Sequence, residues 1–93
     1  MLPKLYRFGR YSIFFWSNED MEPIHVHICV GKLTSNATKV WLTRNGRCIL
    51  AHNKGKIPPE DLNQIFETIE DNFFLIYSEW KSHFKTDNIK FFA

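Results

Sequence analysis

The chain has little net charge and no long apolar run. Its 12 Lys and Arg residues oppose 10 Asp and Glu residues, which leaves a formal charge of +2 at pH 7. A balance this weak does not by itself indicate nucleic-acid binding. No apolar stretch approaches the length that a transmembrane helix needs, so the sequence predicts no membrane association.

Cysteine is scarce as well, and the common catalytic motifs are missing. Cys29 and Cys48 are the only two cysteines, and with no signal-peptide pattern in the chain they fit reduced thiols in the cytoplasm. The sequence has no Walker loop, no Rossmann glycine fingerprint, no Cys-x-x-Cys pair and no nucleophile elbow. We therefore expect a cytoplasmic protein without a cofactor.

Aromatic residues, by contrast, are abundant. They make up 16% of the 93 residues and include nine Phe, so a short chain can still bury a large apolar area. This composition argues against disorder, and the length is that of one small domain. We expect a single domain over residues 1–93, with hairpins and a histidine-containing strand in 4–52, a helical region in 59–84 and a short tail in 85–93.

The first half of the chain has the pattern of short β-strands joined by tight turns. Apolar and aromatic runs flank Gly9-Arg10, and a second pair of runs flanks Asn45-Gly46. Both dipeptides favour two-residue hairpin turns. The strands predicted in this way span residues 4–8, 11–16, 37–42 and 48–52.

Two-residue turns also fix the predicted registers. In the first hairpin they place Lys4 opposite Phe15, and in the second they place Leu42 opposite Ile49. The other pairs predicted for the second hairpin are Val40 with Ala51, Trp41 with Leu50 and Lys39 with His52.

From Pro59 onward the hydrophobic period changes from two residues to about 3.6, which indicates helix. Pro59 suits the first helical turn, and Glu60 and Asp61 complement the positive end of the helix dipole. Asp71-Asn72 interrupts the pattern, so the segment forms either one helix or two. The apolar stripe of this segment consists of Leu62, Ile65, Phe66, Ile69, Phe73, Ile76, Tyr77, Trp80 and Phe84.

These elements predict an α+β fold, in which an antiparallel sheet of about five short strands carries the C-terminal helical region on one face. Successive side chains of a strand point to opposite faces. His25 and His27 are therefore expected to lie exposed on the face opposite the helix. The face expected under the helix carries Val26, Ile28, Val40, Leu42 and Ile49.

His25 and His27 are the strongest candidates for a functional site. Imidazole titrates near neutrality, so the pair could cleave RNA without a metal, with one ring taking the 2′-hydroxyl proton and the other protonating the leaving oxygen. Glu79 and His83 meet on one helical edge, but they are expected on the far side of the sheet. A metal site at His25 and His27 would need a third ligand such as His83. Because that ligand is expected on the far side of the sheet, we expect no metal. The alternative is that both histidines are ordinary strand residues.

Other side chains could support this chemistry. Lys39 and Arg7 are candidate phosphate contacts. Trp41 and Trp80 are candidates for contact with a partner or with nucleic-acid bases. His83 is a third candidate acid or base. For each of these residues the alternative is an ordinary role in packing or on the surface.

Four short motifs follow one another along the chain. They are Ser17-Asn18-Glu19, Pro23-Ile24-His25-Val26-His27, Lys39-Val40-Trp41-Leu42 and Glu79-Trp80-Lys81-Ser82-His83-Phe84. Their order over nearly the whole chain resembles domain-of-unknown-function family 4160. The chain departs from that pattern at Ile24, where many members have a second Pro, and at Ile89 and Phe91, where the family often has a Leu and a second Trp.

The resemblance implies a small bacterial protein whose gene lies beside a second small reading frame, in a toxin–antitoxin-like arrangement. We therefore expect a toxin-like component acting on RNA or translation, with His25, His27 and His83 as catalytic candidates. Its partners would be RNA and the small protein encoded nearby. The alternative is a non-catalytic module that binds a partner protein through its sheet edge or aromatic surface. Either form could assemble as a homodimer.

Overall fold

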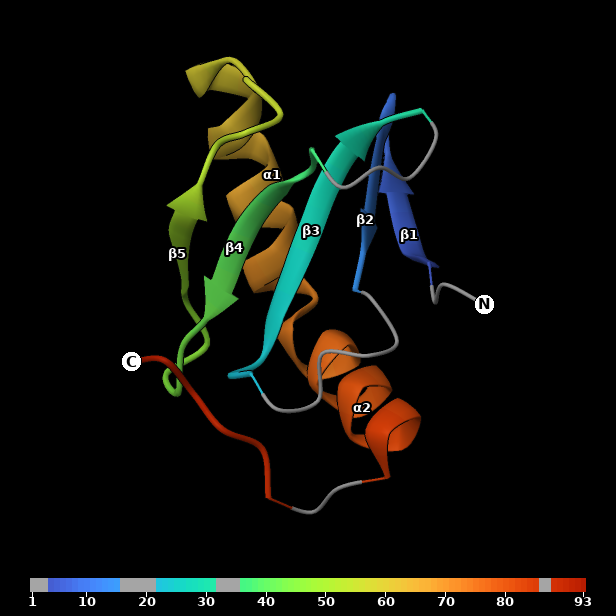
Figure 1. The fold of residues 1–93 in the computed structure, drawn as a ribbon, viewed down its shortest axis with the longest axis vertical. Coiled ribbons are helices and arrows are strands. Elements are labelled where there is room, and N and C mark those ends of the chain that lie inside the picture. Colours follow the sequence, from blue (N-terminus) through green and yellow to red (C-terminus); the bar gives the residue numbers. More distant parts are fainter. Residues whose placement is uncertain (1–3, 16–21, 32–35, 86–87) are drawn as a thin grey trace.

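The computed structural model describes residues 4–15, 22–31, 36–85 and 88–93. Five strands form one antiparallel sheet in which spatial order follows sequence order, and two helices pack against one face of it (Figure 1). The predicted α+β fold is confirmed. The elements are β1 (Lys4–Phe8), β2 (Tyr11–Phe14), β3 (His25–Val30), β4 (Thr38–Leu42), β5 (Cys48–His52), α1 (Pro59–Asp71) and α2 (Phe73–Phe84).

The first hairpin has the predicted turn, and Phe8 lies opposite Tyr11. Gly9 adopts a φ of 57°, a left-handed conformation that glycine reaches at little cost. The prediction for Lys4 is wrong by one residue, because an irregularity in β1 shifts its partner from Phe15 to Phe14. The end of the predicted second strand, at residue 16, lies outside the described residues.

The second hairpin turns with three loop residues instead of two. The backbone N–H of Thr43 donates to the carbonyl of Arg47 over 2.9 Å, and Gly46 has a φ of 81°. A turn followed by a left-handed glycine is the usual three-residue hairpin loop. Asn45-Gly46 thus marks the turn correctly but not its length.

The longer loop changes three of the four predicted pairs in the second hairpin. Each partner on β5 moves by one residue, and an irregularity between Lys39 and Val40 then restores the predicted pairing of Lys39 with His52. Because neighbouring strand residues face opposite sides, Ile49 lies on the side of Trp41 and not under the helix. The observed pairs are Leu42 with Cys48, Trp41 with Ile49 and Val40 with Leu50.

The helical region divides into two helices, as the Asp71-Asn72 interruption allowed. The predicted start at Pro59 is confirmed, with Glu60 and Asp61 in the first turn. At the break, Asn72 has a φ of −110°, and its side-chain amide donates to the carbonyl of Thr68 over 2.8 Å. Neither described helix is long and apolar enough to cross a membrane.

The core lies between the helices and one face of the sheet. The predicted helical stripe supplies one side of it, with Ile65, Ile69 and Ile76 fully buried. The sheet side matches the prediction at Val26, Ile28, Val40 and Leu42, but not at Ile49, which is 40% exposed.

Candidate functional site

The histidine strand β3 is buried on both faces. It is the central strand of the sheet, between β2 and β4, and only Val30 at its end is exposed. His25 is 0% exposed and His27 is 8% exposed. The expectation of an exposed histidine face is therefore wrong.

Three aromatic rings surround the His25 imidazole. Its centroid lies 5.0 Å from His27, 5.5 Å from Trp41 and 5.2 Å from Trp80. Its Nδ1 lies 2.8 Å from the carbonyl oxygen of Pro23, and because a carbonyl only accepts, Nδ1 carries the proton. The ring is thus fixed in orientation and tautomer.

Contact between Trp80 and His25 corrects the expectation that the helical region packs only on the sheet face opposite His25. Trp80 belongs to α2 and to the apolar stripe that packs on the other sheet face. After the break at Asn72, α2 passes the lower end of β3 in Figure 1. A helix there reaches side chains on both faces of the sheet, so the two faces are not separated at this end.

His27 lies in a row of basic side chains that crosses three strands. Lys39 is its register partner on β4, and His52 on β5 is the partner of Lys39. The Lys39 Nζ contacts a Glu22 carboxylate oxygen at 2.5 Å and lies 4.3 Å from the ring centroid of Trp41. Burial is the largest cause that lowers the pKa of His52, and the charges of the nearby Lys54, Lys39 and His27 lower it further. Because an ordinary histidine already titrates below pH 7, His52 is neutral at that pH.

The other predicted site residues lie apart from this row. Arg7 is exposed on β1, where its register partner is Ser12, which in turn pairs with Cys29 and not with a histidine. Glu79 and His83 are both exposed on α2. The centroid of the His83 ring lies 5.3 Å from that of the Phe15 ring.

The structure therefore brings together His25, His27, Lys39, Trp41 and Trp80 from the predicted set. Among the described residues, no three His, Cys, Asp or Glu side chains form a group that could hold a metal ion.

The C-terminal tail takes part in this region, which its sequence indicated only through Phe91-Phe92. The backbone N–H of Ile24 donates to the carbonyl of Lys90 over 2.9 Å, and that of Arg44 donates to Ala93 over 3.1 Å. The Phe92 ring stacks on Trp41, with centroids 5.0 Å apart and planes 8° apart. The tail thus covers Trp41 on the histidine face.

An open surface lies along β5, at one edge of the sheet. Within the described part of the chain, β5 pairs only with β4. Its sequence carries no Lys, Arg, Asp or Glu, and Ile49 and Leu50 are 40% and 39% exposed. The opposite edge strand β1 carries the exposed Arg7, the kind of charge that protects an edge from pairing.

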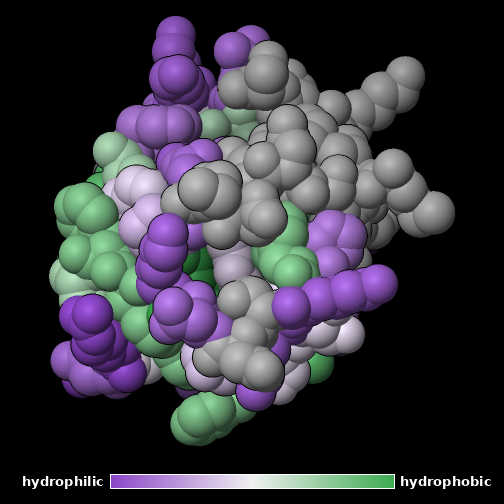
Figure 2. Space-filling model, turned by 60° about the horizontal axis from the view of Figure 1, so that its bottom comes forward, coloured by the Kyte–Doolittle hydropathy of each residue, from purple (hydrophilic) through white to green (hydrophobic). Residues whose placement is uncertain are grey.

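Two hollows of about 450 Å³ each flank the β4–β5 hairpin. They share Arg44 and Asn45, and the second also contains Phe74, which is 82% exposed. In Figure 2, which brings the bottom of Figure 1 forward, apolar side chains lie next to strongly hydrophilic ones on the left of the molecule. The sequence indicated a binding sheet edge or aromatic surface only in general terms, and Phe74 and Leu75, which lie outside the helical stripe, were the signal that could have located it.

The fold and these two regions define a small α+β protein with a buried histidine strand and an open apolar sheet edge. The chain belongs to the family described as Domain of unknown function (DUF4160), whose model matches residues 11–81. The resemblance drawn from the four motifs is thereby confirmed. The matched range contains His25 and His27 but ends before His83. No curated protein and no solved structure matches the chain.

Proposed function

We propose that this chain is a non-catalytic protein-interaction module of a bacterial two-gene system, and that it binds its partner protein through β5. The observation that carries the proposal is an open edge strand without charge, on which Ile49 and Leu50 are about two-fifths exposed. Such an edge presents unpaired backbone groups beside apolar side chains and is a ready site for pairing with another chain.

The surface next to β5 extends this binding face. Phe74 and Leu75 at the start of α2 are 82% and 49% exposed, and Phe74 lines the hollow beside the hairpin. Large apolar residues gathered at one place on a surface often mark an interaction site. The burial of His25 and His27 fits the same function, because a catalytic group must reach its substrate.

A second candidate function is that of a toxin-like component acting on RNA or translation. It is favoured by the row of His27, Lys39 and His52, which combines two imidazoles with a cation. In this function His25 and His27 would act as acid and base in RNA cleavage without a metal. Lys39 would stabilise the negative charge of the pentacoordinate phosphorus species formed during that cleavage.

One experiment compares the two functions. The tagged chain is expressed with and without the protein encoded by the neighbouring gene, and co-purification, growth and total RNA are measured. An interaction module should retain the partner, lose it in Ile49→Lys and keep it in the matched opposite-edge variant Arg7→Glu. Intact RNA and normal growth at high expression would exclude the toxin-like function. Retention of the partner by a folded Ile49→Lys variant would contradict binding through β5.

A further inference from the structure

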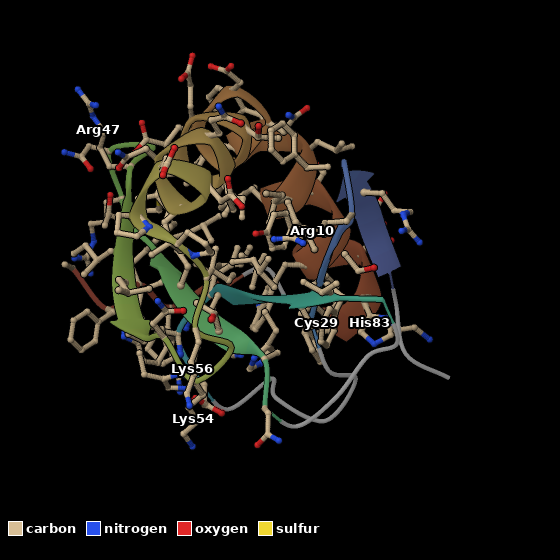
Figure 3. All side chains as sticks on the ribbon, turned by 90° about the horizontal axis from the view of Figure 1, so that it is seen from above. Arg10, Cys29, Arg47, Lys54, Lys56 and His83 are labelled. Atoms are coloured by element: carbon tan, nitrogen blue, oxygen red, sulfur yellow. The ribbon has the colours of Figure 1, made fainter. Side chains whose placement is uncertain are left out.

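The charges that flank β5 in the sequence are all of one sign. Residues 23–59 contain six Lys and Arg residues and no Asp or Glu. Four of these cations lie next to β5 in the sequence, with Arg44 and Arg47 before the strand and Lys54 and Lys56 after it. Figure 3 shows Arg47 on one side of the sheet edge and Lys54 and Lys56 on the other. An uncharged apolar edge thus lies between two cationic ends.

These cations are available to a partner. Arg44, Lys54 and Lys56 are exposed, and no ion pair joins them to a carboxylate within the described residues. Arg47 approaches Glu70 only at 3.5 Å and remains largely in solvent. Exposed pairs of this kind stabilise the free protein little, so little is lost when a new carboxylate replaces the old contact.

We infer that β5 binds an extended peptide segment whose apolar centre is flanked by acidic residues at both ends. The inference rests on the proposed function, since it names the kind of partner that the edge would take. The segment would add a strand to the sheet, with backbone hydrogen bonds along β5 and apolar side chains beside Ile49 and Leu50. Its flanking carboxylates would lie near Arg47 at one end and Lys54 at the other.

A second copy of this chain is a poor occupant of the same edge. Antiparallel pairing of two β5 strands would bring Arg47 of one copy near Lys54 of the other, and parallel pairing would bring equivalent cations together. Like charges opposite one another destabilise paired strands. RNA is also disfavoured, because Ile49 and Leu50 interrupt the cations with aliphatic surface and Trp41 is already stacked on Phe92.

The test uses two labelled, capped peptides with the same alternating valine and threonine centre. One has glutamates at both ends and the other has lysines, and binding to the full chain is followed by fluorescence anisotropy at low and high salt. The wild type should bind the glutamate peptide about tenfold more tightly than the lysine peptide, and less tightly at high salt. The double variant Lys54→Glu, Lys56→Glu reverses one of the two cationic ends and should abolish most of the preference, whereas Arg7→Glu should leave it unchanged.

Several outcomes would overturn the inference. They are equal binding of the two peptides, binding of neither, a dimer of the chain that Ile49→Lys separates, and binding of an oligouridine in place of the glutamate peptide. Thermal unfolding confirms that each variant is folded. If the natural partner is lost in Ile49→Lys but retained by the charge-reversed variant, the proposed function stands and the acidic segment is excluded. If the Ile49→Lys variant also retains the natural partner, both the proposed function and the acidic-segment inference fail.

Discussion

At the scale of single residues, His25 has a structural role that its position in a polar-looking motif conceals. Its Nδ1–H donates to Pro23, which precedes β3, and its ring fills space between Trp41 of β4 and Trp80 of α2. A polar ring with no exposed surface is tolerated because its hydrogen bond is made inside the protein. His25 therefore joins strand, sheet and helix at one point.

Replacing His25 by alanine should destabilise the protein. The change leaves a cavity beside two Trp rings and removes the hydrogen bond to Pro23, so we expect a loss of about 2–4 kcal/mol in the free energy of unfolding. His83→Ala is the matched control, because His83 is exposed and should change stability by less than about 1 kcal/mol. Urea unfolding of both variants measures the difference, and equal effects would contradict a structural role for His25.

At the scale of elements, the β4–β5 hairpin decides which side chains the edge strand presents. Its three-residue loop puts Ile49 on the face of Trp41, next to the tail residue Ala93 across a shared hollow. A two-residue loop would have placed Ile49 under the helix. One loop residue thus separates a core side chain from a surface one.

Gly46→Ala should weaken this hairpin. Gly46 has a φ of 81°, and a Cβ there would meet no atom within 4 Å, so the penalty is conformational and not steric crowding. We expect a loss of about 1 kcal/mol for alanine and a smaller one for Gly46→Asn, since Asn enters the left-handed region more readily. Urea unfolding tests this order. An alanine variant as stable as the wild type would show that the left-handed conformation is not required.

The sequence predicted the elements well because strands and helices differ in hydrophobic period. Strand existence, the helix start at Pro59 and the break near Asn72 all follow from local pattern and turn chemistry. Loop length in the second hairpin did not follow, since Asn-Gly occurs in loops of more than one length.

The site was harder to predict than the elements. Period-two alternation correctly put His25 and His27 on one face, but it says nothing about what covers that face. His25 is covered by Trp80, which α2 brings past the sheet end, and the half-buried Trp41 beside it is covered by Phe92 in the tail. Both are contacts between residues far apart in the sequence, which a local pattern does not contain.

At the scale of the whole molecule, protonated side chains of two strands hold α1 near both of its ends. The Tyr11 hydroxyl on β2 donates to Asp61 over 2.5 Å, and the Cys48 thiol on β5 lies 3.5 Å from a Glu70 oxygen. Burial, then the Asp61 hydrogen bond, raises the pKa of Tyr11. Burial and the nearby Glu70 charge raise the pKa of Cys48 from 9.0 to about 12.

These pKa shifts predict alkaline lability. Both groups keep their protons in the folded protein at pH values where the unfolded chain loses them, so the stabilisation is complete below the ordinary pKa of 9.0 for Cys48 and is lost as the pH rises toward 12. The free energy of unfolding should therefore fall from pH 9 upward. Cys48→Ala should show a shallower fall in urea titrations at stepped pH. Equal slopes in wild type and variant would exclude Cys48 as a cause.

The order of the strands has a consequence for how the chain reaches this structure. Each of the four strand pairs joins neighbours in the sequence, so each ladder closes a short loop, at a low entropic cost. A sheet of this kind is expected to form rapidly by successive hairpin additions. The pairings of Ile24 with Lys90 and of Tyr11 with Asp61 span much longer separations. We therefore expect the histidine strand to be enclosed late in folding, after the five-stranded sheet has formed.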